Sequence, residues 1–197
     1  MRGANLAGGM PTGHGGISRI RARSPMAGYR PGKYFPSGLG AFPAKFWGMP
    51  NVPGLRSPYV KVGRLVYFGR MLDKIRLQAA GQLPAADYAA NLGKGFDSRC
   101  CNFLRIKYDE LKARALQGGA DDELLTWAEA QGGRRTDEEC EIWNGFMMKR
   151  GWRDAAAGTL AQRIKESALE AAPVMTMFDY LDFDEGRDPV SIRAWEK

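Results

Sequence analysis

Apolar residues recur every three or four positions between residues 65 and 79, and this periodicity constrains the fold more than any other feature of the chain. The recurring residues are Leu65, Phe68, Leu72, Ile75 and Ala79. Such spacing is typical of an α-helix that packs one side against a core. Four charged residues occupy the rest of this helix: Arg70, Asp73, Lys74 and Arg76. We expect them to form a solvated face with pairs at i,i+3 and i,i+4. The alternative is a cluster that binds an anion together with a second element.

Capping residues and helix breakers divide the chain after residue 54 into further helical segments. Gly81 and Pro84 end the central helix near residue 80, and Thr136 with Glu139 forms the capping box of a later helix. Ser57 suits the start of a short segment at 58–62. Further helices are expected at about 98–104, 109–117, 123–131, 137–150, 154–171 and 174–183. No stretch alternates as a strand does, so the sequence predicts an all-α fold: a single compact multi-helix domain with short connections.

Residues 1–53 differ in composition and are expected to form an extended Gly/Pro/Arg-rich N-terminal arm without a core of its own. The first 50 residues contain seven basic residues and no Asp or Glu: Arg2, Arg19, Arg21, Arg23, Arg30, Lys33 and Lys45. The whole chain has 29 basic and 22 acidic residues, so its formal net charge of +7 belongs entirely to the arm. The charge therefore does not indicate that the folded body binds nucleic acid.

Basic and aromatic residues are interleaved in the second half of this arm. The residues expected to contact a partner are Arg19, Arg21, Arg23, Arg30, Tyr34, Phe46 and Trp47. The favoured interpretation is docking in the grooves of a protein assembly or of the chain's own body. The second is binding of RNA, whose phosphates and bases suit cations and aromatic rings. The third is an organelle transit peptide, since the leader is Arg-rich and free of acids.

A Gly-Lys-Gly sequence at residues 93–95 is the candidate second element of an anion site. Two glycines beside Lys94, just before a helix that Asp97 can cap, allow backbone N–H groups to face an anion. The candidate ligand-binding residues are therefore Arg70, Asp73, Lys74, Arg76, Lys94 and Asp97. The spacing matches neither a P-loop nor a dinucleotide fingerprint, and a flexible loop is the simpler interpretation. Asp73 and Asp97 would form an acid–base pair if the fold brought them together; neutralising nearby arginines is their simpler role.

No known catalytic motif occurs in the sequence, so no catalytic residue is predicted. The single histidine, His14, lies in the arm, and no CxxC motif is present; neither a metal site nor a cofactor is expected. Cys100, Cys101 and Cys140 are an odd number of cysteines, which favours reduced thiols in a cytoplasmic protein. The apolar runs are too short for a transmembrane segment.

Several short motifs together resemble a known family. They are Pro53-Gly54-Leu55-Arg56-Ser57-Pro58, Gly69-Arg70-Met71-Leu72-Asp73-Lys74-Ile75-Arg76, Gly95-Phe96-Asp97, Ile142-Trp143-Asn144 and Phe178-Asp179-Tyr180-Leu181-Asp182. The pattern is similar to that of a bacterial family of small helical proteins described only as a domain of unknown function, and it covers about residues 53–187. The resemblance implies a bacterial origin and one helical domain, but no activity, cofactor or catalytic residue.

The sequence thus predicts three regions: the basic, aromatic-containing arm at 1–53, a helical domain at 54–187 and a C-terminal tail at 188–197. The favoured function is that of a non-catalytic binding or accessory protein, with the arm docking the domain onto a larger assembly. The alternative is an enzyme or sensor that binds a small phosphate or carboxylate between the helix at 70–76 and the loop at 93–97. The third interpretation is RNA contact through the arm.

Overall fold

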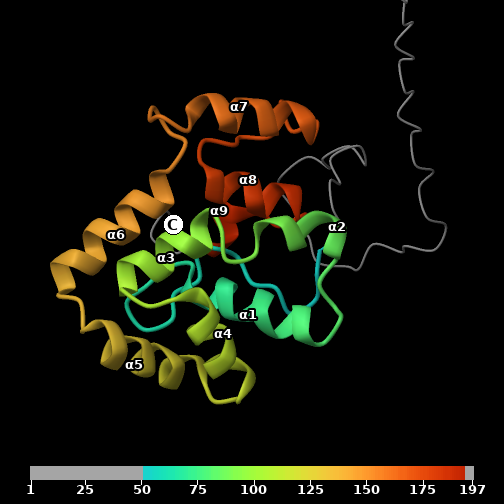
Figure 1. Cartoon of the computed structure of the whole chain (residues 1–197). Coiled ribbons are helices and arrows are strands. Elements are labelled where there is room, and N and C mark those ends of the chain that lie inside the picture. The colour runs from blue at the N-terminus through green and yellow to red at the C-terminus, as the bar shows by residue number, and fades with distance from the viewer. Residues whose placement is uncertain (1–50, 194–197) are drawn as a thin grey trace, which may run out of the picture. The chain divides into compact units, whose positions relative to one another are not determined.

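The computed structural model describes residues 51–193, and the structural statements below refer to them. Within this range the regular structure is helical, apart from an isolated bridge between Val62 and Leu65. Figure 1 shows the helices in chain order: α1 Phe68–Ala79, α2 Ala85–Tyr88, the 3-10 turn η2 Ala89–Asn91, α3 Phe96–Leu104, α4 Tyr108–Leu116, α5 Asp121–Gly132, α6 Asp137–Lys149, α7 Ala157–Glu166, α8 Met177–Asp184 and α9 Pro189–Ile192. The predicted all-α fold is confirmed for these residues. The predicted arm lies outside them, apart from residues 51–53.

Helix α1 forms the centre of the core, as its apolar periodicity predicts. Phe68, Met71, Leu72 and Ile75 have no exposed surface, and α4 packs directly against α1 (Figure 1). Burial is not confined to the apolar stripe, because charged residues on the other sides of α1 are buried too. A helix enclosed in this way can keep its charges only if other elements supply partners for them.

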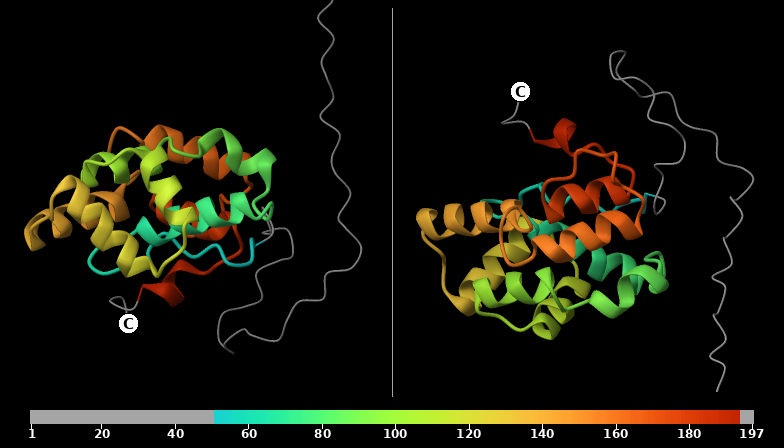
Figure 2. Two further views of the ribbon diagram at one scale, coloured as in Figure 1. Left: turned by 60° about the horizontal axis from the view of Figure 1, so that its bottom comes forward. Right: turned by 90° about the horizontal axis from the view of Figure 1, so that it is seen from above.

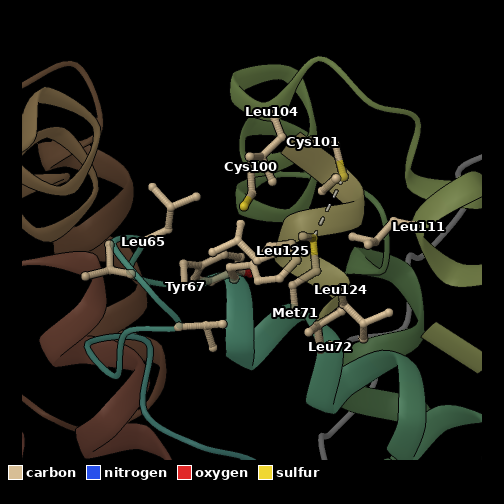
Figure 3. Packing of buried hydrophobic residues seen from close by; sticks show 14 of the residues in the cluster. Leu65, Tyr67, Met71, Leu72, Cys100, Cys101, Leu104, Leu111, Leu124 and Leu125 are labelled. Atoms are coloured by element: carbon tan, nitrogen blue, oxygen red, sulfur yellow. Dashed lines mark hydrogen bonds between the residues drawn. The ribbon is translucent and has the colours of Figure 1, made fainter. Parts of the chain in front are cut away.

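Helices α3, α4 and α5 complete the core around Met71 (Figure 3). Leu104 of α3, Leu111 of α4 and Leu124 of α5 are fully buried in one cluster with it. The Cys101 thiol lies 3.9 Å from the Met71 sulfur. Burial raises the pKa of Cys101 to about 12, so the thiol stays protonated at neutral pH and packs as a small apolar group.

The segment before α1 differs from the sequence prediction, because residues 58–62 form a turn and irregular backbone up to the bridge at Val62, and not a helix. The Ser57 hydroxyl accepts from the backbone N–H of Tyr59 at 3.2 Å and donates to Asp182 at 2.6 Å. Asn144 then fixes the end of the segment, since its side chain accepts from the N–H of Val66 at 3.0 Å and donates to the carbonyl of Arg64 at 2.8 Å. Partners more than 75 residues away thus hold this segment in an irregular path.

Helix ends follow local capping chemistry more closely. The predicted capping box of α6 is confirmed: the backbone N–H of Glu139 donates to Thr136 at 3.1 Å, and that of Thr136 donates to Glu139 at 2.7 Å. Helix α7 is shorter than the expected 154–171, because the Asp154 carboxylate caps the N–H of Ala156 and Ala168 adopts a φ of 54°. Figure 1 and the right view of Figure 2 show α7 alongside α8, against which it packs.

Among residues 51–193, no helix combines the length and the apolar character needed to cross a membrane.

Candidate functional site

Helices α1, α2, α3, α7 and α8 line a cavity of about 370 Å³. This size lies at the lower end of the roughly 300–1,000 Å³ of small-molecule sites. Most lining residues on each long helix have another lining residue three or four positions away, as one helix face requires. They are Tyr67, Arg70 and Lys74 from α1 and its N-cap; Asp87, Tyr88 and Asn91 from the α2–η2 segment; Lys94, Gly95, Phe96 and Arg99 around the start of α3; Arg150 after α6; Ala156, Thr159 and Arg163 from α7 and its N-cap; and Met177, Tyr180, Leu181, Asp184 and Glu185 from α8 and its C-cap.

Arg70 is only 2% exposed, and its guanidinium forms a two-pronged ion pair with Glu185. The Glu185 carboxylate also accepts from the Tyr88 hydroxyl at 2.7 Å and from the Arg187 side chain. Burial alone would raise the pKa of Glu185, but the charge of Arg70 and its hydrogen bonds lower it below the ordinary value. The Arg70 charge is therefore neutralised within the protein, and the pair forms a rigid part of the cavity wall.

Lys74 is neutralised in the same way by Asp97. Its ammonium group donates to Asp97 at 2.6 Å and to the Tyr67 hydroxyl at 3.1 Å. Burial lowers the pKa of Lys74, against the opposing pull of the Asp97 charge. Asp97 also accepts from the Tyr67 hydroxyl at 2.9 Å and from the N–H of Gly93 at 3.0 Å. A carboxylate that accepts from three groups is suited to holding the α1 wall and the Gly93–Gly95 loop together.

Asp73 and Arg76 belong to a separate ionic cluster that does not line the cavity. Asp73 accepts from Arg56 through both carboxylate oxygens at 2.6 Å. Asp121 joins Arg56 and Arg76, at 2.7 Å and 2.6 Å. Of the six residues predicted from the sequence, Arg70, Lys74 and Lys94 therefore lie around one cavity, Asp97 supports Lys74, and the other two lie elsewhere.

The expectation of a solvated charged face on α1 is wrong for Arg70, Asp73 and Lys74, which are 2–6% exposed. Asp73 and Asp97 do neutralise basic groups, as the simpler interpretation held. Their partners, Arg56 and Lys74, are not the nearby arginines that were expected. The charges are buried because partners from other elements replace the water that a surface helix would keep.

The cations at the mouth of the cavity are in a different situation. Lys94 and Arg99 are exposed, and neither forms an ion pair within the part of the chain that the structure describes. Arg163 lies over the Tyr180 ring at 5.8 Å, and Arg150 pairs with Asp154 at 2.7 Å. The N-terminal ends of α3 and α7, which carry partial positive charge, reach the same cavity. The mouth therefore offers positive charge that the buried pairs do not cancel.

Sequence reasoning missed Arg99, Arg150, Arg163, Asp184 and Glu185 as cavity residues. The spacing of Met177, Tyr180, Leu181 and Asp184 is a visible helical signal. It shows that these residues share a face, but not what that face meets. Asp184 is buried at 7% exposure, and this burial raises the pKa of its carboxyl. Among residues 51–193, no three His, Cys, Asp or Glu side chains are grouped as a metal site requires.

The described residues thus define an all-helical protein in which buried charges are paired internally beside a polar cavity. The chain belongs to the family described as Domain of unknown function (DUF5069), whose model matches residues 52–187. The resemblance stated from the motifs is confirmed over nearly the same range, while the bacterial origin stays a prediction. A comparison with curated proteins gives no match to this chain.

The polar residues of the motifs that carry the resemblance are largely partners of one another. Arg56 pairs with Asp73, Ser57 bonds to Asp182, and Lys74 pairs with Asp97. Much of this sequence pattern is therefore explained by architecture, since these contacts connect the segment before α1, α1, α3 and α8.

Proposed function

We propose that this protein binds a small anionic ligand, a phosphate or carboxylate compound, in the cavity between α3, α7 and α8. The observation that carries the proposal is the pair Lys94 and Arg99: both line the cavity, both are exposed, and neither has an ion pair among the described residues. The ligand class is that of the alternative drawn from the sequence, which placed the ligand between the helix at 70–76 and the loop at 93–97. The proposed site keeps the loop but lies against α7 and α8, because Arg70 and Lys74 are neutralised within the protein. Docking through residues 1–53 stays a prediction, since residues 1–50 lie outside the described part of the chain.

The local backbone supports this use of the loop before α3. Gly95 is the N-cap of α3 and has a φ of 57° with a ψ of −118°, a conformation that a residue with a Cβ rarely adopts. It leads the chain from Lys94 directly into the first turn of α3, where the positive end of the helix dipole favours an anion by about 0.3–1 kcal/mol. The Asp97 carboxylate accepts from the backbone N–H of Gly93 at 3.0 Å. This hydrogen bond holds the loop in place before a ligand binds.

The test is thermal unfolding of the full chain at low ionic strength with increasing orthophosphate, pyrophosphate or citrate. A ligand that binds only the folded protein stabilises it by RT ln(1 + [L]/Kd), so we expect at least one of these anions to raise Tm progressively. The variant Lys94→Gln/Arg99→Gln removes two exposed charges of the cavity that have no ion pair among the described residues, and it should lose most of this rise. Lys165→Gln is the matched control, because Lys165 is exposed on α7 and does not line the cavity.

The proposal fails if none of the anions raises Tm of the unmodified chain. It also fails if the double variant responds as fully as the control. Isothermal titration of the same variants then separates binding at the cavity from a general effect of salt, because a salt effect has no saturable stoichiometry.

A further inference from the structure

The cavity differs chemically at its two ends, and α8 gives the direction between them. Met177 and Asp184 lie on the same face of α8, two turns or about 10 Å apart at roughly 1.5 Å per residue. The backbone N–H of Met177 donates to the carbonyl of Arg150 at 2.8 Å. At the other end Glu185 follows Asp184 and accepts from Tyr88. Arg150 and Tyr88 therefore mark opposite ends of the cavity.

The Arg150 end is cationic. Arg99 and Arg150 both line the cavity, and their guanidinium carbons lie 5.6 Å and 5.8 Å from the centre of the same ring, that of Phe146. Ala156, the N-cap of α7, and Thr159 in its first turn also line the cavity. Arg150 also pairs with Asp154 at 2.7 Å, whereas Arg99 has no ion pair among the described residues. Planar guanidinium groups beside a helix N-terminus suit the oxygens of a phosphate better than a single point charge would.

Apolar and aromatic side chains separate the two ends. Phe96 packs against Tyr67 and Phe178 at ring distances of 5.4 Å and 5.5 Å, yet it stays half-buried and lines the cavity. Tyr180 and Leu181 contribute from α8. A ligand that reached from one end of the cavity to the other would have to place an apolar or flat part against these side chains.

The Asp184 end supplies hydrogen-bond acceptors. Asp184 and the exposed Asp87 both line the cavity. Asp184 already lies within reach of the Ser167 and Tyr180 hydroxyls and near the Arg163 charge. A carboxylate has about four acceptor sites, so it can take a further donor. Two carboxylates repel a simple anion. A ligand that fills a cavity with cations at one end and carboxylates at the other must therefore carry a second functional group besides its anionic one. An amino or hydroxyl donor at the end remote from the anionic group satisfies a carboxylate acceptor and gives the ligand one orientation.

We propose that the ligand is a phosphomonoester with a flat, amino-bearing ring, the chemical class of a nucleoside monophosphate. Its phosphate lies at the Arg99 and Arg150 end, its ring lies against Phe96, and its ring amino group donates to Asp184. This inference rests on the proposed binding of an anion in the same cavity and adds the identity and direction of the organic part.

The test is isothermal titration of the full chain with four compounds: adenosine 5′-monophosphate, purine riboside 5′-monophosphate, ribose 5-phosphate and orthophosphate. The second lacks only the amino group, the third lacks the ring, and the fourth lacks the organic part. We expect affinity to fall in that order, with about a fivefold loss on removal of the amino group. Arg99→Gln should weaken the three phosphomonoesters by similar factors, and Lys165→Gln should leave them unchanged.

Asp184→Asn tests the direction of binding. It keeps the shape of the side chain but replaces a charged acceptor by a weaker one, so it should weaken the adenine nucleotide about fivefold and the purine riboside analogue hardly at all. Asp87→Asn, at the exposed carboxylate that also lines the cavity, is the control and should leave the preference for the amino group unchanged.

The outcomes separate the two proposals. If orthophosphate or ribose 5-phosphate binds as tightly as the adenine nucleotide, an anion site exists but the nucleotide inference is overturned. If the unmodified chain binds the two purine nucleotides equally, or if Asp184→Asn weakens both by the same factor, the assigned orientation is overturned. If none of the four compounds binds and no other anion raises Tm, the proposed function fails as well.

Discussion

At the scale of single residues, the charge of the buried Arg70 is compensated by the equally buried Glu185. Removing one member of a buried pair leaves the other charge without compensation, which typically costs about 3–5 kcal/mol. Glu185 also has Arg187 and Tyr88 as partners. We therefore expect Arg70→Met to lower the free energy of unfolding by about 3 kcal/mol, at the lower end of that range.

Urea unfolding measures this cost. Lys107→Met is the matched control, since Lys107 pairs with Glu110 at 3.3 Å but is 83% exposed. An exposed pair contributes little, so the control should unfold at nearly the same urea concentration as the unmodified chain. Equal stability of the Arg70 variant and the control would show that the buried pair does not hold α1 to the C-terminal end of α8.

Part of the candidate site was predictable from the types of residues in the sequence. The residues that lie opposite them in the fold were not. Lys94 between two glycines signals a loop that can hold an anion, and the structure places Lys94 at the cavity. Arg99 and Arg163 look like ordinary surface charges, because helical spacing does not reveal which elements lie opposite. Glu185 pairs with Arg70 across 115 residues, a contact that no local pattern encodes.

At the scale of elements, helix α5 ends where α3 leaves no room for a side chain. A Cβ on Gly132 would lie 1.7 Å from the backbone carbonyl oxygen of Leu104, whereas one on Gly145 in α6 would meet nothing within 4 Å. We expect Gly132→Ala to lower the free energy of unfolding by more than about 2 kcal/mol, since backbone cannot rotate away as a side chain can. Gly145→Ala should raise it by about 0.5–1 kcal/mol, because alanine loses less entropy in a helix.

Both values come from urea unfolding of the two variants beside the unmodified chain. If both substitutions changed the free energy of unfolding in the same direction, the close approach of α5 to α3 would not be the reason that position 132 requires glycine. The comparison is internal, because the chemical change is identical and only the surroundings differ.

Helices were predictable where their caps are local. The box of Thr136 and Glu139 lies within four residues, and α6 begins where it indicates. The structure of the segment at 58–62 was not predictable in this way, because the Ser57 hydroxyl donates to Asp182 and does not cap a helix. Local capping chemistry is thus overruled where a distant carboxylate offers the hydroxyl a buried partner.

At the scale of the whole molecule, many groups buried as neutral acids should make the fold sensitive to alkali. Burial raises the pKa of Tyr67 and Tyr88 above 10.0 and those of Cys100 and Cys101 above 9.0. A group whose pKa is raised on folding contributes stability that is complete below its unfolded pKa and is lost as pH rises towards its folded pKa. For the thiols this loss starts near pH 9, and for the phenols near pH 10. Lys74, whose pKa burial lowers, has the opposite sign but is a single group.

We therefore expect the free energy of unfolding to fall steeply above about pH 9, by roughly 1.4 kcal/mol per pH unit for each such group that ionises only after unfolding. Urea midpoints at pH 7, 9 and 10.5 measure the slope. Absorbance of tyrosinate near 295 nm gives an independent reading, because Tyr67 and Tyr88 should ionise only as the chain unfolds. Two results would contradict the buried, hydrogen-bonded setting of Tyr67, Lys74 and Asp97. One is a constant urea midpoint over this pH range, and the other is ionisation of all tyrosines while the helical circular dichroism is intact. Either result would also contradict the rigid cavity wall that these residues form.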